Sequence, residues 1–202
     1  MITFDQFNEF VEKAHKNAVE HGFYDGAKLT NSAVQQRQML IVCEVAEAME
    51  ADRKQRWLTQ SKETFDELKA IVDGKECCSD FNKYYSLFIK GFAEEELADI
   101  CIRCFDLFGF TKSKFHCFDL VHFVTTEKDI RIEQHTKAMP FWELCYTLTK
   151  TITPKNLVWI GIYKTVYYCF AWCDYNDIDL LTHIKAKMMY NTNRPYKHGK
   201  AY

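Results

Sequence analysis

Proline and glycine are scarce in this 202-residue chain, which has three and seven of them. These two residues mark most tight turns and flexible linkers, so their scarcity leaves little room for either. The sequence also lacks sustained alternation of apolar and polar residues, the pattern that half-buried strands produce. These absences favour helices.

A secretion signal and a clear membrane span are absent as well. The N-terminus, MITFDQFNEF, has no basic segment followed by an apolar one. The most apolar stretch, residues 157–173, is slightly short for a bilayer, rich in aromatic residues and interrupted by Lys164, so we expect a core helix and no membrane partner. Nine cysteines are an odd number in a chain that is not short, so we expect reduced thiols and a cytoplasmic protein.

The length fits one ordinary domain with a single core. Apolar residues recur at helical spacing, and Thr3 with Gln6 resembles a capping box at the first helix. The expected helices cover about residues 3–22, 31–56, 62–73, 92–108, 136–150, 157–173 and 177–193. Residues 74–80 predict a loop, and residues 112–131 give no clear pattern. We therefore expect one all-α domain, a helical bundle over residues 1–202.

The stretch MLIVCEVAEAME, residues 39–50, places two carboxylates inside an apolar run. Glu44 and Glu47 are three residues apart, so on a helix they project from one face. Glu96 and Asp99 repeat this spacing on another expected helix. Either pair alone is common on an exposed helix, but the apolar surroundings and the duplication favour two pairs that face each other.

Carboxylates that face each other need a cation. Two like charges about 5 Å apart repel by roughly 3 kcal/mol at an effective dielectric constant of about 20. All-oxygen ligation selects a hard ion, so we predict Mg²⁺, or Mn²⁺ as the alternative, with substrate phosphates as further ligands. Arg103 and Asp106 continue the face of Glu96 and Asp99. Arg103 is expected to pair with Asp106 or with one of the metal-ligating carboxylates without binding the metal itself.

Iron and zinc are the two alternative metals, and the sequence favours neither. A carboxylate-bridged di-iron bundle uses Glu-x-x-His on two helices, and the chain does not supply that motif twice. Zinc would need thiols, and Cys101 with Cys104, like Cys169 with Cys173, are about one helical turn apart. Their apolar surroundings favour buried thiols instead.

The C-terminal segment is basic. Five cations and no acid follow Asp179, so the chain's net charge of −2 divides into +5 after this residue and −7 up to and including it. The expected last helix and its exit align Lys187, Asn191 and Arg194 on one face. With Lys197 and Lys200 these residues form a set that can grip a polyphosphate. A nucleic-acid contact is the alternative, although five charges on an acidic chain make a weak footprint.

These features resemble the MazG-like, all-α nucleoside triphosphate pyrophosphohydrolases, relatives of the dimeric dUTPases. Four stretches, which with their flanks cover about half of the chain, carry the resemblance: AVEHGFYD (18–25), CEVAEAMEADR (43–53), EEELADICIRCFDL (94–107) and DIDLLTHIKAKMMYNTNRPYKHGK (177–200). Residues 54–90 and 111–175 are longer than the compact members need, so they are expected to be insertions. The first would cover the nucleobase pocket, and the second would add two or three helices.

The resemblance implies a Mg²⁺ site made by Glu44, Glu47, Glu96 and Asp99. It implies cleavage of a nucleoside triphosphate to the monophosphate and pyrophosphate, which clears non-standard nucleotides or tunes dNTP pools. It also implies a homo-oligomer, commonly a dimer or a tetramer. Among the carboxylates, Glu47 is the candidate base that accepts a proton from the attacking water.

The remaining expected roles concern the substrate. Lys187, Asn191, Arg194 and Lys197 would hold phosphate oxygens, and Phe23 with Tyr24 are candidates for stacking on a base. The alternative function is a non-catalytic module that binds a nucleotide or Mg²⁺. A pyrophosphate-release assay distinguishes the enzyme from the non-catalytic module.

Overall fold

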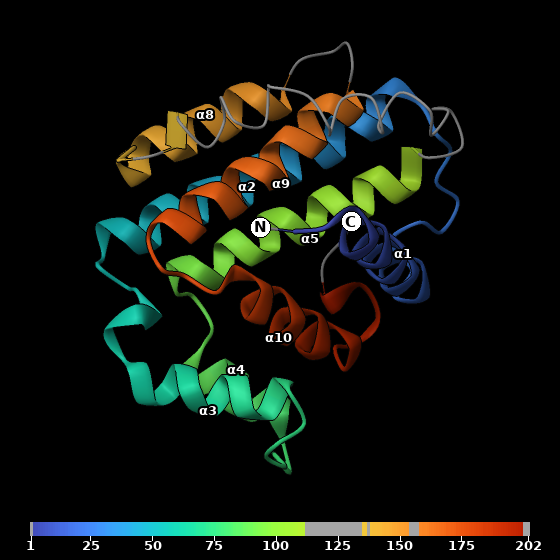
Figure 1. Cartoon of the computed structure of the whole chain (residues 1–202). Helices are drawn as coiled ribbons and strands as arrows, with labels where there is room; N and C mark the ends of the chain where they lie inside the picture. The colour runs from blue at the N-terminus through green and yellow to red at the C-terminus, as the bar shows by residue number, and fades with distance from the viewer. Residues whose placement is uncertain (1, 112–134, 137, 154–157, 200–202) are drawn as a thin grey trace.

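The structure is a computed structural model that describes residues 2–111, 135–136, 138–153 and 158–199. Within these ranges every regular element is a helix, which confirms the all-α class (Figure 1). The stretch without a clear pattern, residues 112–131, lies outside the described residues.

The described residues form eight α-helices and two short 3₁₀ helices. In chain order they are α1 (Phe4–Glu20), α2 (Asn31–Arg53), η1 (Leu58–Gln60), α3 (Lys62–Val72), α4 (Phe81–Phe88), α5 (Ala93–Thr111), α8 (Phe141–Ile152), α9 (Val158–Tyr175), α10 (Leu180–Thr192) and η3 (Tyr196–Gly199).

Helix α5 is the centre of the bundle. It contacts α1, α2, α9 and α10, while α8 packs against α2 and α9 on the outer side (Figure 1). Its apolar side chains, among them Leu97, Ile100 and Phe105, are fully buried in the main core. Side chains of α5 are therefore held in place by several surrounding helices at once.

Helices α3 and α4 lie apart from the main core, below α10 in Figure 1. They form a small second cluster in which the ring of Tyr85 stacks on Tyr190 of α10 with centroids 4.6 Å apart. Glu94, at the start of α5, accepts hydrogen bonds from the backbone N–H groups of Leu58 at 2.9 Å and Thr59 at 2.8 Å. These bonds fix the beginning of η1 and tie the α3–α4 segment to α5.

Several expected boundaries are confirmed within a few residues, including the capping box of Thr3 and Gln6 on α1. Helix α4 was not expected. It begins after Asp80, whose side chain accepts from the backbone N–H of Lys83 at 3.0 Å, and its aromatic residues gain stability by packing on α10. The sequence pattern alone could not reveal that contact.

Two other boundaries differ for clear physical reasons. Helix α5 continues through Gly109, near which the helix was expected to end. A Cβ at this position would lie 2.6 Å from the Cβ of His15. This glycine allows α1 to approach α5 closely. The helix expected from residue 136 begins at Phe141 instead, because Pro140 has the extended backbone that precedes a helix.

The aromatic stretch predicted as a core helix forms α9, which is buried in the main core. Within the described part of the chain, no helix is both long and apolar enough to cross a membrane. The eight cysteines that the structure describes are all free thiols.

The imidazole of His183 in α10 predicts a pH-dependent stability. The side chain is 2% exposed, its Nδ1 has no hydrogen-bond partner among the described residues, and burial lowers its pKa from 6.5 to about 4. Below pH 6.5 the unfolded chain binds a proton that the folded protein excludes, so the free energy of unfolding falls as the pH drops from 6.5 toward 4. The expected loss at pH 5 is about 2 kcal/mol.

Urea unfolding of the wild type and of His183→Leu, at pH 7 and pH 5, measures this effect. Carboxyl groups titrate in both proteins, so only the difference between the two pH dependences reports on His183. The same loss of stability in both proteins would contradict the assignment.

Candidate functional site

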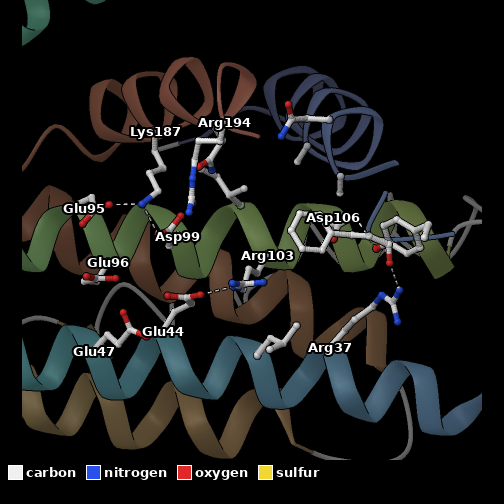
Figure 2. A pocket seen from close by; sticks show the side chains of 18 of the residues that line it. Arg37, Glu44, Glu47, Glu95, Glu96, Asp99, Arg103, Asp106, Lys187 and Arg194 are labelled. Carbon is white, nitrogen blue, oxygen red and sulfur yellow. Dashed lines mark hydrogen bonds and ion pairs between the residues drawn. The ribbon is translucent and has the colours of Figure 1, made fainter. Parts of the chain in front are cut away.

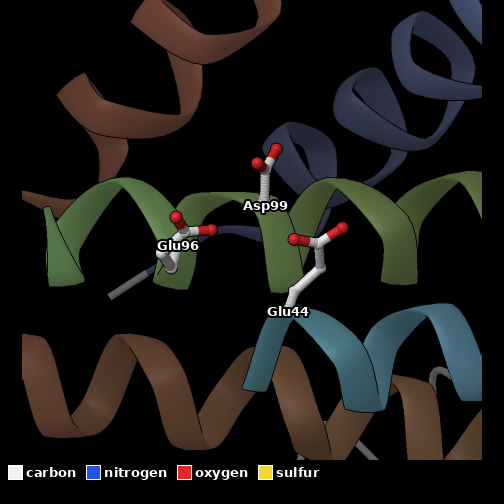
Figure 3. Close-up of side chains that lie close together, drawn as sticks. All are labelled: Glu44, Glu96 and Asp99. Carbon is white, nitrogen blue, oxygen red and sulfur yellow. The ribbon is translucent and has the colours of Figure 1, made fainter. Parts of the chain in front are cut away.

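Three carboxylates from two helices converge. Glu44 on α2 and both Glu96 and Asp99 on α5 place carboxylate oxygens within 4.8 Å of one another (Figure 3). Glu44 and Glu96 are buried and Asp99 is partly buried. Among the described residues this is the one group of three or more acidic, histidine or cysteine side chains close enough to share an ion. We call it the carboxylate triad.

Glu47, the fourth predicted ligand and the candidate base, lies outside the triad. It is exposed, and it lines the cavity onto which the triad opens. Because Glu47 lies three residues after Glu44 on the helix, its side chain points about 60° away from that of Glu44. This direction places Glu47 at the rim of the cavity. Its position suits contact with a molecule in the cavity better than membership of the triad.

Burial and mutual repulsion raise the pKa of two carboxyls in the triad. The pKa of Glu96 rises to about 9, first through burial and then through the nearby Glu95 and Asp99. The pKa of Glu44 also rises through burial and Asp99, against the opposing effect of Arg103. Such carboxyls ionise more readily when a cation joins them, and a set of oxygen donors fits a hard divalent ion.

Two basic side chains already pair with the triad (Figure 2). Arg103 donates from Nε to Glu44. Lys187 of α10 lies 2.6 Å from Asp99 Oδ2 and also donates to Glu95. Burial alone would lower the pKa of Lys187, but Asp99 and Glu95 outweigh burial and raise the pKa, so the ammonium group stays charged.

These pairs refine two expectations. Lys187 was expected to hold phosphate; it lines the cavity, and its buried Nζ is paired with Asp99 and Glu95. Arg103 was expected to hold either Asp106 or a carboxylate of the site, and it holds Glu44.

Glu95 is a residue of the site that sequence reasoning missed. Its carboxylate accepts from Lys187 and, at 2.6 Å, from the backbone N–H of Gly91. A signal for this role was present, because Glu95 precedes Asp99 by four residues and the two therefore share one face of α5. That face meets α10, whereas Glu96 lies on the side of Glu44 (Figure 2).

The triad opens onto a cavity of about 290 Å³. The cavity follows α2 and α5 from the triad to Arg37 and Asp106 (Figure 2). The apolar Leu40 and Ile102, which lie between these residues in the sequences of the two helices, also line it. All of residues 54–90 are described, and Lys90 alone among them lines the cavity. This segment, expected to cover a nucleobase pocket, therefore contributes one residue to the lining of the cavity.

A connected set of side chains builds the end of the cavity away from the triad. Asp106 accepts from the Tyr24 hydroxyl at 2.7 Å and lies 2.9 Å from Nδ1 of His15. The guanidinium carbon of Arg37 lies 4.4 Å from the ring centroids of both Tyr24 and Phe110. The ring of Tyr24 is thus held by protein groups, which leaves less room for the expected base stacking.

Phe23, the other candidate for stacking, lines the cavity beside Tyr24. The chain's single Glu-x-x-His pair, Glu12 with His15, does not build a metal site: Glu12 is exposed, and His15 pairs with Asp106.

Two of the other predicted phosphate contacts reach the cavity. Asn191 and Arg194 line it on the side of α10, and Oδ1 of Asn191 is buried without a partner among the described residues. The side chain of Lys197 does not line the cavity and extends over the ring of Tyr196, with Nζ 5.8 Å from the centroid. Lys200 lies outside the described residues.

The segment after α10 is anchored to the turn after α1. The His21 ring lies 3.0 Å from the Arg194 carbonyl oxygen, and the backbone N–H of Lys197 donates to the His21 carbonyl at 2.9 Å. The Tyr196 hydroxyl donates to Asp25. Two of the stretches that carry the sequence resemblance therefore meet, and their contact positions Arg194.

Gly22 makes this contact possible. Its φ is +76°, and a Cβ there would lie 2.1 Å from the Tyr196 ring. We expect Gly22→Ala to release the segment and to speed tryptic cleavage after Lys197 by at least about tenfold, because the added Cβ collides with the Tyr196 ring. This collision comes on top of the roughly 1–3 kcal/mol of left-handed strain that an alanine meets at such a φ.

Gly26→Ala is the matched control for this prediction. Gly26 has a similar φ of +70°, but no atom lies within 4 Å of the added Cβ. Equal cleavage rates in the two variants would mean that Tyr196 does not depend on the glycine.

The cysteines do not form a competing metal site. Cys101, Cys104, Cys169 and Cys173 are all buried between α5 and α9. They do not belong to any ion-sized group among the described residues. Burial raises the pKa of Cys101, Cys104 and Cys173, so these thiols stay neutral. The zinc alternative is therefore not supported.

Comparison of the chain with protein-family models, curated proteins and solved structures gave no match. The function has to be inferred from the chemistry of the site.

Proposed function

We propose that the protein is a Mg²⁺-dependent nucleoside triphosphate pyrophosphohydrolase, with Mn²⁺ as an alternative ion. It would cleave an NTP or dNTP to the monophosphate and pyrophosphate. The observation that carries the proposal is that the carboxylate triad shares one cavity with Asn191 and Arg194. The cation of a metal–polyphosphate complex fits the carboxylates, and its phosphate oxygens fit Asn191 and Arg194. The sequence resemblance to MazG-like enzymes supports the same reaction.

Glu44, Glu96 and Asp99 would hold the ion. A bound Mg²⁺ supplies coordination for phosphate oxygens and lowers the pKa of a bound water. Arg103 orients Glu44 and Lys187 orients Asp99, so the ligand oxygens are positioned before the ion arrives.

The remaining residues act on the substrate. Arg194 and Asn191 bind phosphate oxygens from the opposite wall of the cavity, where the planar guanidinium can contact two oxygens at once. Glu47, at the rim, accepts a proton from the attacking water. The pyrophosphate then leaves with its charge balanced by Arg194.

The test is pyrophosphate release from the canonical and damaged NTPs and dNTPs with Mg²⁺. We expect stoichiometric monophosphate and pyrophosphate, and no turnover in EDTA. Release of inorganic phosphate and a diphosphate, or turnover that survives EDTA, would contradict the proposal.

A second candidate is a non-catalytic module that binds a nucleotide with its metal. It is favoured by the two ion pairs, because Arg103 and Lys187 already compensate part of the charge of the triad. This candidate predicts Mg²⁺-dependent nucleotide binding by calorimetry without any pyrophosphate release.

A further inference from the structure

Arg37 is a cation that faces the cavity without a carboxylate partner among the described residues. Nη1 donates to the Ala33 carbonyl at 3.0 Å and Nη2 to the Phe23 carbonyl at 3.5 Å, and the guanidinium carbon lies 4.4 Å from the ring centroids of both Tyr24 and Phe110. Tyr24 is in turn fixed by its bond to Asp106. The guanidinium is therefore held in position, and it is partly buried where a ligand can reach it.

The separation between Arg37 and the triad is set by helix geometry. Arg37 and Glu44 are seven residues apart on α2, which corresponds to about 10 Å along the axis. Asp99 and Asp106 repeat this separation on α5. The apolar Leu40 and Ile102 line the cavity between the ends. A nucleotide has the same order of parts, with charged phosphates, a sugar and then a polar base edge.

We infer that Arg37 reads the base of the nucleotide, and that the preferred substrates carry uracil, thymine, guanine or hypoxanthine. This inference rests on the proposed function, which places the phosphates at the triad. The Arg37 end then receives the base.

The chemistry of the base edge gives the preference. A guanidinium only donates hydrogen bonds, so it needs acceptors on its ligand. Uracil and thymine present a carbonyl oxygen where cytosine presents an amino group, and guanine and hypoxanthine do so where adenine presents one. An amino group in that place would set a donor against the N–H groups of Arg37 that face the cavity, which penalises cytosine and adenine.

Binding of non-hydrolysable α,β-imido analogues tests the inference apart from catalysis. Calorimetry with Mg²⁺ would compare the analogues of dUTP with dCTP, and of dGTP with dATP. We expect the wild type to bind the carbonyl member of each pair about 10- to 100-fold more tightly, the discrimination that one arginine–base pair supplies. In Arg37→Gln the ratio should approach one.

Arg37→Lys keeps the positive charge but loses the planar fork, so it should also lose the preference. Arg53→Gln, an exposed arginine on the same helix, should keep it. Inorganic triphosphate has no base, and its affinity should be unchanged in Arg37→Gln. Circular dichroism verifies that each variant is folded.

Several results would overturn the inference: no preference in the wild type, no binding of any analogue, or an equal loss for all analogues and for triphosphate in Arg37→Gln. The last result would make Arg37 a phosphate contact. Selective binding without pyrophosphate release from any nucleotide would leave the inference intact and reject the proposed hydrolysis. Hydrolysis with no base preference would do the reverse.

Discussion

Replacing Glu96 by glutamine is expected to stop nucleotide turnover while making the metal-free protein more stable. The group keeps its size and can still accept a hydrogen bond, but it loses the charge that a divalent ion needs. Loss of a residue that only orients a metal ligand typically costs 10- to 100-fold, so loss of a ligand should reduce kcat/KM by at least about 100-fold. Pyrophosphate release measures this effect.

The gain in stability follows from the raised pKa of Glu96. The carboxyl has a pKa of about 9 in the folded protein and an ordinary value of 4.5. Between these values the folded protein holds a proton that the unfolded chain has released, so the free energy of unfolding falls as the pH rises. Glutamine has no charge to bury and is free of this loss.

After allowance for solvent screening, the gain at pH 8 is about 2 kcal/mol, or roughly 4–8 °C in Tm. It should appear in EDTA, and Mg²⁺ should stabilise the wild type but not the variant. Glu12→Gln, an exposed change on α1, is the control and should alter neither property. A Glu96→Gln protein with lower stability in EDTA would show that the carboxylate is not under repulsion.

Replacing Lys187 by methionine is expected to cause the largest loss of stability of any change considered. The ammonium group is buried between Glu95 and Asp99, and its removal leaves both carboxylates without their cation. Breaking a buried ion pair from one side costs about 3–5 kcal/mol, or roughly 6–20 °C in Tm for a chain of this size. Thermal unfolding in EDTA measures the loss.

Lys185→Met is the matched control, because Lys185 is exposed on the same helix. It should change Tm by no more than about 2 °C. Adding Glu95→Gln to Lys187→Met should recover part of the loss, since one buried charge fewer then remains uncompensated. If both lysine variants unfold at the same temperature, the ion pairs of Lys187 are not formed in solution.

The sequence could predict the helices and the convergence of three of the four acids, because apolar surroundings make a solvated position for Glu44 implausible. It could not predict the partner of each acid. Lys187 and Glu95 are 92 residues apart, and their contact depends on how α10 crosses α5. The regular spacing of Lys187, Asn191 and Arg194 suggested one common role, and all three line the cavity, but only Lys187 is paired with carboxylates of α5.

The Arg37 end of the cavity was also beyond the reach of the sequence. Tyr24 was predicted as a candidate for stacking on a base, not as a partner of Arg37, and Phe110 lies beyond the expected end of its helix. Phe110 contacts Arg37 from the part of α5 beyond Gly109, and this glycine allows α1 to approach α5 closely. Local propensity carries no information about that approach.

The central place of α5 also governs how the protein should lose its site. Amide hydrogens near Glu96 and Asp99 are shielded by helices on several sides, so they should exchange with deuterated solvent only when the whole bundle opens. Helices α3 and α4, held by a smaller cluster, can open earlier and alone. In mild urea, the amides of α3 and α4 should therefore exchange while the carboxylate triad keeps its geometry. Loss of activity in urea should coincide with global unfolding.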